Sequence, residues 1–470
     1  FPEVVSISRH TNPTIPSDER YNRLIAGNFQ SPGSSWTAPL PSNNVWPRYW
    51  DSFLSQLSGL GISPSEQTIG FVDTGVDSGL LESGVAYCPP YLRPPGYPTQ
   101  PCKLVFTADV TSNAPESQGD DRYHHGTIVT SVASGFASSD SPGRDTQGYS
   151  FTQGVAPGAK VAICQFFSLC GSTYRSEGEA NPFSQGNPYQ RLQYALVSLG
   201  STVTLPDNGP GPGAHIINHS WNRQDVVDYE ETTHLLDETT RSLKVASFLF
   251  RNDQRVDGPD RSVLHVVSAG NRSTPHPQDD TDAELIPHRL VTAPGIAKNA
   301  ITVGATESYN QETYIVGGFP TYCPNANIDN ADDPHQIGSF SRFGFPNLRL
   351  KPDLVAPGTR AYGRRSADYI ALPTCSPNTD CNMDLDGTGQ YGWANGTSFS
   401  APAVSGAAAL VRAWLVSLGA TNPSPALIKA ALIATARSIT SLPACSSGCQ
   451  PCCAACGDVR PAPDKYQGFG

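Results

Sequence analysis

Short apolar segments recur along this 470-residue chain, and segments with helical patterns lie between them. The apolar segments are rich in β-branched residues and short enough to be buried strands. Strands that alternate with helices predict right-handed crossovers and a mostly parallel sheet covered on both faces. We therefore expect an α/β, three-layer fold. The predicted strands are Thr68 to Val72, Lys160 to Phe166, Ala214 to Asn218, Leu264 to Ser268 and Ile301 to Val303, and the predicted helices include Tyr189 to Leu199 and Glu230 to Phe250.

The net charge of the chain limits its partners. The formal charge is −11, and the sequence contains no basic run or basic amphipathic helix. A nucleic-acid backbone is therefore not an expected partner. We also expect no membrane span, because no apolar stretch approaches the required length. The chain opens at Phe1-Pro2 without a methionine, so we expect that it has been processed.

Cysteine usage indicates an oxidising compartment. The chain has twelve cysteines, most of them close pairs in polar, proline-rich loops, which favours disulfides and hence secretion. The run from Cys445 to Cys456 holds five cysteines whose partners stay unassigned, and Cys323 could pair with one of them. A zinc knuckle is the alternative for this run. The predicted bridges are Cys88 with Cys102, Cys164 with Cys170, and Cys375 with Cys381.

The stretch Tyr391 to Gly406 reads YGWANGTSFSAPAVSG and carries the clearest chemistry. Gly396 permits a tight turn just before the hydroxyl of Ser398, and the apolar spacing that follows predicts a helix from about residue 398 to 418. A hydroxyl at a helix N-terminus faces unpaired backbone N–H groups, which suit an oxyanion. Serine is a weak nucleophile, so it also needs a base and a carboxylate that orients the base.

Candidates for both partners occur at predicted element ends. Asp73 directly follows the predicted strand Thr68 to Val72, at the end of a parallel strand where sites form. His124 and His125 precede Gly126 and Thr127, and apolar residues at helical spacing come next, so a base would lie at another helix start. Asn271 lies just after another predicted strand.

These motifs together resemble those of the subtilisin-like serine proteases, the subtilases. The resemblance rests on NGTS at 395–398 with Ala401-Pro402, on VDTGVD at 72–77, on His125-Gly126-Thr127 and on SAGN at 268–271, and it covers about residues 60 to 470. The chain looks most similar to the larger alkaline subtilases that carry a C-terminal β-sandwich, and its last residues resemble a family motif cut short. The resemblance implies the subtilisin-like three-layer fold.

The resemblance also implies a role for each motif. It makes Ser398 the nucleophile, His125 the base and Asp73 the orienting carboxylate, with Asn271 as an oxyanion donor. The function implied is a secreted serine endopeptidase that acts through an acyl-enzyme on polypeptides in extended conformation. The alternative is a catalytically blocked binding or structural subunit, and a specific processing enzyme remains an alternative to a broad degradative one. The implied substrate-binding residues are Ser220, Trp221, Asn222, Ser268, Ala269 and Gly270.

Three positions depart from the usual family pattern. The family usually has glycine where this chain has His124, which adds bulk beside the base. Phe399 stands where many subtilases have an oxidisable methionine, so activity should survive peroxide. Arg272 stands where glutamate is frequent, and a cation there should disfavour basic side chains at the cleaved position.

The remaining expectations concern the first 45 residues and a metal. Residues 46–470 are assigned to the catalytic domain, and residues 1–45 to an N-terminal extension or a remnant of the pro-region linker, with a pro-segment as an inhibitory partner. Structural calcium is expected at alternating oxygen ligands that precede Gly387. The alternative is a solvated acidic loop, because position twelve of the count is Trp393 and not glutamate. The calcium candidates are Asp380, Asn382, Asp384 and Asp386.

Overall fold

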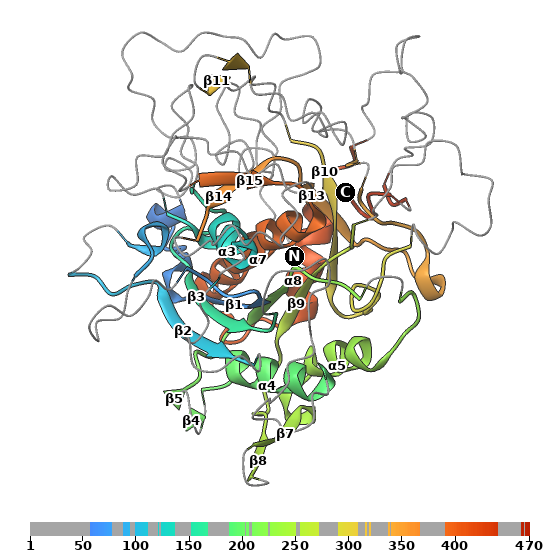
Figure 1. Cartoon of the computed structure of the whole chain (residues 1–470). Helices are drawn as coiled ribbons and strands as arrows, with labels where there is room; N and C mark the ends of the chain where they lie inside the picture. Colours follow the sequence, from blue (N-terminus) through green and yellow to red (C-terminus); the bar gives the residue numbers. More distant parts are fainter. Residues whose placement is uncertain are drawn as a thin grey trace, which may run out of the picture.

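The structure is a computed structural model with a central sheet, helices on either side of it and several small hairpins (Figure 1). It describes residues 57–77, 88–94, 99–110, 121, 124–136, 152–167, 188–202, 204–205, 209–223, 226–250, 254–271, 290–308, 315–316, 319–320, 337–338, 340–366, 391–439, 462–464 and 466–470.

The central sheet has seven strands in the order β13-β10-β9-β6-β1-β3-β2, and every neighbouring pair is parallel. Because the spatial order differs from the chain order, the strands are joined by crossovers, and β1 lies between β6 and β3 inside the sheet. This arrangement confirms the α/β fold class. The strands are β1 (Thr68–Asp73), β2 (Leu104–Asp109), β3 (Lys160–Gln165), β6 (Ile216–His219), β9 (Leu264–Ser268), β10 (Ile301–Thr306) and β13 (Leu354–Pro357).

Helices cover both faces of the sheet (Figure 1). One face packs against α3 (His125–Ser134), α7 (Thr397–Ser417) and α8 (Pro425–Thr435). The other packs against α4 (Pro188–Gly200) and α5 (Glu231–Thr239). The predicted three layers are therefore present.

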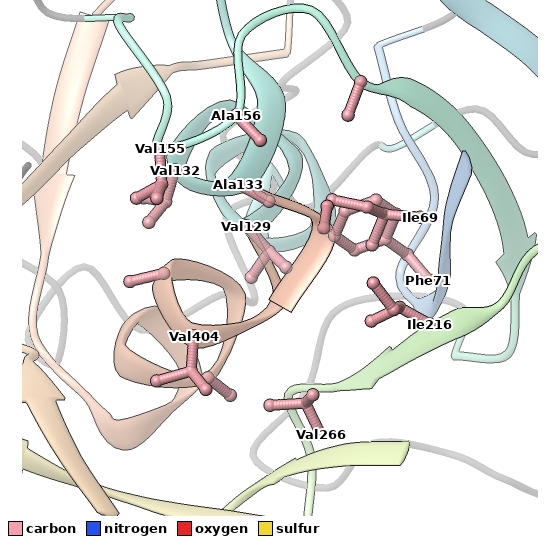
Figure 2. Close-up of a cluster of buried hydrophobic side chains, with 14 of the residues drawn as sticks. Ile69, Phe71, Val129, Val132, Ala133, Val155, Ala156, Ile216, Val266 and Val404 are labelled. Atoms are coloured by element: carbon pink, nitrogen blue, oxygen red, sulfur yellow. The ribbon is translucent and has the colours of Figure 1, made fainter. Parts of the chain in front are cut away.

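Alternation along the strands supplies both cores. In β1, Phe71 belongs to the cluster under α3 and α7, whereas its neighbour Val72 belongs to the cluster under α4 and α5. Consecutive strand residues point to opposite faces, so a strand covered on both sides must be apolar throughout. Figure 2 shows the first cluster, which contains Ile69, Phe71 and Ile216 of the sheet together with Val129 of α3.

The small elements complete the chain trace. A hairpin of β14 (Ala361–Arg364) and β15 (Tyr391–Ala394) leads directly into α7, which fixes the position of the turn before that helix. The other hairpins pair β4 (Thr204–Leu205) with β5 (Gly209–Pro210), β7 (Ser247–Phe250) with β8 (Gln254–Asp257), and β11 (Ile315–Val316) with β12 (Phe319–Pro320). Short 3₁₀ turns occur at Pro64–Glu66, Pro90–Leu92, Leu243–Val245 and Pro346–Leu348.

The predicted helix from Glu230 to Phe250 is wrong in its second half. The helix α5 ends at Thr239, where the Thr239 and Thr240 hydroxyls donate to carbonyls of the preceding turn. A 3₁₀ turn follows, and the run Ser247–Phe250 forms β7. Two threonines in succession disfavour helix continuation, and the apolar run that comes next suits a strand.

The helix α7 bears on the expectation of no membrane span, because an apolar stretch of sufficient length is present. Among the described residues it is the single helix long and apolar enough to cross a membrane, with a mean hydropathy of 1.4 in its most apolar window. That window is 67% buried inside the protein. A core helix that packs against apolar neighbours can have the same length and composition as a membrane helix, and the buried part of α7 explains its apolar sequence.

One predicted disulfide forms and another does not. Cys88 and Cys102 are bonded, which agrees with the sequence analysis. Cys164 is instead a free thiol that is fully buried, so the predicted bridge to Cys170 is wrong. The Cys164 side chain points from β3 into the core between the sheet and α4, where it packs as a small apolar group. The predicted Cys375 to Cys381 bridge, Cys323 and the cysteines from 445 to 456 lie outside the described residues.

Candidate active site

Asp73 ends β1 at the middle of the sheet, with β3 and β6 on either side. Its side chain is buried, and one carboxylate oxygen, Oδ1, accepts three hydrogen bonds. The donors are the backbone N–H of Thr74 at 2.8 Å, the Thr74 hydroxyl at 3.3 Å and Nδ1 of His125 at 2.7 Å. The ring nitrogen that faces Asp73 is thereby held as the N–H, and Nε2 is the nitrogen left to act as a base.

The helix α3 brings His125 to Asp73 because its first turn packs on the end of β1. A Cβ added to Gly126 would lie 2.0 Å from the carbonyl oxygen of Gly75, so only glycine permits this approach. The backbone N–H of Gly126 donates to the Thr74 hydroxyl at 2.9 Å. The Gly-Thr that follows the histidine is therefore a packing requirement of the site.

His124 occupies the N-cap of α3 in the left-handed conformation, with φ of 64°. That conformation explains in physical terms why glycine suits the position. The imidazole is buried, and burial lowers its pKa to about 3, with Arg365 and His125 acting in the same direction. His124 is therefore a neutral buried side chain beside the candidate base.

Asp121 was missed by the sequence analysis. Its carboxylate connects the segment after β1 with the first turn of α3. One oxygen accepts from the backbone N–H and the hydroxyl of Thr127 in α3, at 2.8 and 2.6 Å. The other accepts from the hydroxyl of Thr74 at 2.9 Å, so the single hydroxyl proton of Thr74 is shared between Asp121 and, at 3.3 Å, Oδ1 of Asp73. Burial raises the pKa of Asp121 to about 6, although these hydrogen bonds lower it. A signal was available in its position four residues before His125 and in the threonine that follows Gly126.

Ser398 lies in the first turn of α7, where the sequence analysis expected it. The preceding Gly396 has φ of 155° and ψ of 154°, a conformation open essentially to glycine alone. The Ser398 hydroxyl donates to the carbonyl of Ser220 at 3.0 Å, and the Ser220 hydroxyl donates to the carbonyl of Ser398 at 2.6 Å. This reciprocal pair ties the start of α7 to the segment after β6. The adjacent Phe399 is buried, with its ring 5.5 Å from that of His125.

Asn271 is fixed against the same turn by a residue that the sequence analysis did not single out. Its Oδ1 accepts from the backbone N–H and the hydroxyl of Thr397, both at 2.9 Å. The Thr397 hydroxyl in turn accepts from the backbone N–H of Gly270 at 3.1 Å. The side-chain amide nitrogen of Asn271 then faces Gly396, where an added Cβ would come within 3.0 Å of it. A hydrogen-bond donor therefore lies beside the Ser398 turn.

The six candidate substrate-binding residues lie at the carboxyl ends of two neighbouring strands: Ser220, Trp221 and Asn222 follow β6, Ser268 ends β9, and Ala269 and Gly270 come directly after it. The side chains of Asn222 and Ser268 bond each other across the two segments. Gly270 has φ of 98°, and Ala269 is fully buried. The indole of Trp221 stacks on Phe166 at 5.5 Å and so packs on the α4 side of the core.

Several candidates cannot be placed. Arg272 and the calcium candidates Asp380, Asn382, Asp384 and Asp386 lie outside the described residues. Within the part of the chain that the structure describes, no group of three or more histidine, cysteine, aspartate or glutamate side chains could hold a metal ion.

A family model described as peptidase S8, the subtilase family, matches residues 65–470 of the chain. The chain belongs to the subtilase family. The match covers Asp73, His125, Asn271 and Ser398. In this subtilase the fold brings these four residues to the carboxyl ends of the central strands.

This subtilase was also compared with curated proteins and with solved structures. A search of curated proteins returned no match. A structure described as proteases from Pseudoalteromonas arctica is 16% identical, with a TM-score of 0.45 over 82% of this chain and 88% of that one. MycP1 with its N-terminal propeptide removed is 18% identical, with a TM-score of 0.44 over 83% of this chain and 89% of that one.

Proposed function

We propose that this subtilase is a secreted serine endopeptidase whose catalytic residues are Asp73, His125 and Ser398. The observation that carries the proposal is the 2.7 Å hydrogen bond between His125 Nδ1 and a buried carboxylate oxygen of Asp73, beside a serine at a helix N-terminus. A histidine oriented by a carboxylate is the base that a serine nucleophile requires.

The reaction begins when the Ser398 hydroxyl turns from the Ser220 carbonyl toward Nε2 of His125. The Ser398 oxygen bonds to the peptide carbonyl carbon while its proton passes to Nε2, and Asp73 stabilises the imidazolium that forms. The carbonyl electron pair moves to oxygen. This oxyanion accepts hydrogen bonds from the backbone N–H of Ser398 and the side-chain amide of Asn271, a donor worth on the order of 3 kcal/mol of barrier.

The second half of the reaction restores the enzyme. The tetrahedral intermediate expels the amine, which takes the proton from His125 and leaves an acyl group on Ser398. Water then attacks the acyl carbon, gives a proton to His125 and displaces the serine oxygen, which recovers that proton. The products are a free amine and a free carboxylic acid.

Further features belong to the same proposal. Polypeptide substrates bind in extended conformation along the segments after β6 and β9, where backbone groups can pair with them. The Cys88–Cys102 disulfide supports secretion, because such bonds persist in oxidising compartments. A pro-segment inhibitor, structural calcium at residues 380–386 and kinship with the larger alkaline subtilases that carry a β-sandwich are also proposed on the sequence resemblance.

Intact-mass analysis after treatment with a fluorophosphonate tests the proposal. Only an activated serine reacts with this probe, so we expect one adduct on the protein and none on the Ser398→Ala variant. Peptide mapping should place the adduct on Ser398. Hydrolysis of an unstructured protein such as casein by the unmodified chain, and not by the variant, would establish endopeptidase activity. A folded protein that takes up no probe would instead favour the blocked subunit.

A further inference from the structure

The segments after β6 and β9 are tied together by one pair of side chains. The amide nitrogen of Asn222 donates to the backbone carbonyl of Ser268 at 2.8 Å, and the hydroxyl of Ser268 donates to the amide oxygen of Asn222 at 2.9 Å. The two strands pair up to His219 and Val267; Ser268 is the last residue of β9, and Asn222 lies just beyond the end of β6. The Asn222–Ser268 pair therefore connects the two segments past their last backbone pairing.

The bridge lies where a substrate side chain must enter. The nucleophile contacts the first segment through the carbonyl of Ser220, at 3.0 Å. Asn271, the proposed oxyanion donor, ends the second segment. The residue that contributes the attacked carbonyl carries its side chain one bond from the carbonyl carbon. Residues 220–222 and 268–270 therefore flank the position at which this substrate residue would bind.

The space there is already occupied. Gly270 has no side chain, but a Cβ added to it would lie 3.4 Å from Cγ of Asn222, 3.1 Å from the Thr292 hydroxyl and 3.0 Å from Cδ of Arg342. The amide of Asn222 thus covers the bare backbone of Gly270. Ser268 is fully buried, so displacing its partner would leave the Ser268 hydroxyl without that acceptor in the interior.

We propose that the Asn222–Ser268 pair restricts the substrate residue whose carbonyl is attacked to small side chains, namely glycine, alanine and serine. This inference rests on the proposed endopeptidase function. A larger side chain must break both hydrogen bonds of the pair and displace the Asn222 amide before the carbonyl can reach Ser398. Selection by a filled binding site of this kind is expected to be worth roughly 100-fold in kcat/KM.

The test uses a set of internally quenched peptides that differ only at this residue, which is glycine, alanine, serine, leucine or phenylalanine. For the unmodified protein, kcat/KM should be about 100-fold higher with alanine than with phenylalanine. The Asn222→Gly variant removes the amide, so the alanine-to-phenylalanine ratio should fall at least about tenfold, through faster cleavage of the phenylalanine peptide. Ser268→Ala removes one of the two hydrogen bonds and should give an intermediate ratio.

Controls make the result specific. A second peptide set varies the residue after the cleaved bond, and its selectivity should be the same in all three proteins. Equal cleavage of alanine and phenylalanine peptides by the unmodified protein would overturn the inference, and so would an unchanged ratio in both folded variants. Fluorophosphonate labelling distinguishes failure of this inference from failure of the proposed function. A protein that forms the adduct but cleaves all peptides equally contradicts this inference alone. A protein that forms no adduct and hydrolyses no peptide contradicts the proposed function.

Discussion

Single buried polar residues hold the candidate catalytic groups in place. Asp121 connects Thr74, next to Asp73, with Thr127 at the start of the His125 helix. Thr397 connects Asn271 with the turn before Ser398, because its backbone N–H and its hydroxyl both donate to Oδ1 of Asn271. These residues act through others, so their substitution should change the geometry of the site and the titration of its surroundings.

Asp121 should make stability depend on pH in an identifiable way. Its pKa is about 6 in the folded protein against an ordinary value of 3.8, so the folded state binds more protons between these values. The free energy of unfolding should therefore fall as the pH rises from 3.8 through 6, by roughly 3 kcal/mol relative to Asp121→Asn. Urea unfolding of both proteins at about pH 3.5 to 7.5, in a Ser398→Ala background that prevents autolysis, measures the difference. Parallel stability curves would contradict the role of this carboxyl.

Thr397 should affect turnover more than substrate binding. Thr397→Val keeps the volume but removes the hydroxyl that donates to Asn271 and accepts from Gly270. Without that contact the Asn271 amide loses its orientation, and we expect kcat to fall roughly 10- to 100-fold with KM nearly unchanged. Thr397→Ser, which retains the hydroxyl, should recover most of kcat. Steady-state kinetics on one peptide measures all three proteins, and a KM effect in Thr397→Val without a kcat effect would argue against this assignment.

The helices α3 and α7 pack closely on their neighbours at the candidate active site. The helix α3 approaches the end of β1 over the bare Cα of Gly126, and α7 enters the core from the β14–β15 hairpin through the unusual backbone of Gly396. Both helices begin on the side of the sheet where the carboxyl end of β1 lies. The positions of the candidate base and nucleophile thus follow from where two helices start.

Gly126→Ala should abolish the docking of α3 on β1. The new Cβ would lie 2.0 Å from the Gly75 carbonyl oxygen, a backbone atom that cannot move without shifting Asp73. We expect a loss of several kcal/mol of stability, or no folded protein. Gly59→Ala is the matched control, since an added Cβ there meets nothing within 4 Å. Thermal unfolding in the Ser398→Ala background compares the two, and equal melting temperatures would show that the contact is dispensable.

The whole molecule joins distant parts of the chain through its sheet and one described disulfide. Cys88 and Cys102 close a loop beside β2, with Cys88 buried against the core that contains Tyr91 and Leu92. The loop constrains the unfolded chain while leaving the seven-stranded sheet intact. Its contribution should therefore appear in stability and leave the fold unchanged.

Removal of this disulfide should lower stability without changing the far-UV spectrum. The sequence separation of 14 residues corresponds to about 3 kcal/mol in the chain-entropy account. We expect Cys88→Ala/Cys102→Ala to lose that amount in guanidinium unfolding, again in the Ser398→Ala background. The single Cys102→Ala variant should lose nearly as much, because opening either end frees the loop. Coincident unfolding curves for the variants and their parent would contradict this expectation.

The sequence predicted strands and short motifs, which depend on neighbouring residues. It did not predict side-chain contacts between segments that are far apart in the chain. The strand β1 was predicted because both of its faces are buried and its sequence is continuously apolar. The edge strand β2 was missed because it is buried only at alternate positions. Asp73, His125 and Ser398 lie in short motifs and could be selected from sequence. The contacts of Asp121 and the Asn222–Ser268 pair join segments that are separate in the chain, so local patterns do not reveal them.

The candidate nucleophile lies on α7, which packs against five of the seven strands of the central sheet, and this has a consequence for the order of folding. Ser398 follows all seven strands of the central sheet in the chain, and α7 packs against β1, β6, β9, β10 and β13. Apart from its contacts with α3 and α8, the apolar surface that α7 packs on comes from strands in separate parts of the chain. We therefore expect Ser398 to reach its final position beside Asp73 and His125 only after the sheet has assembled.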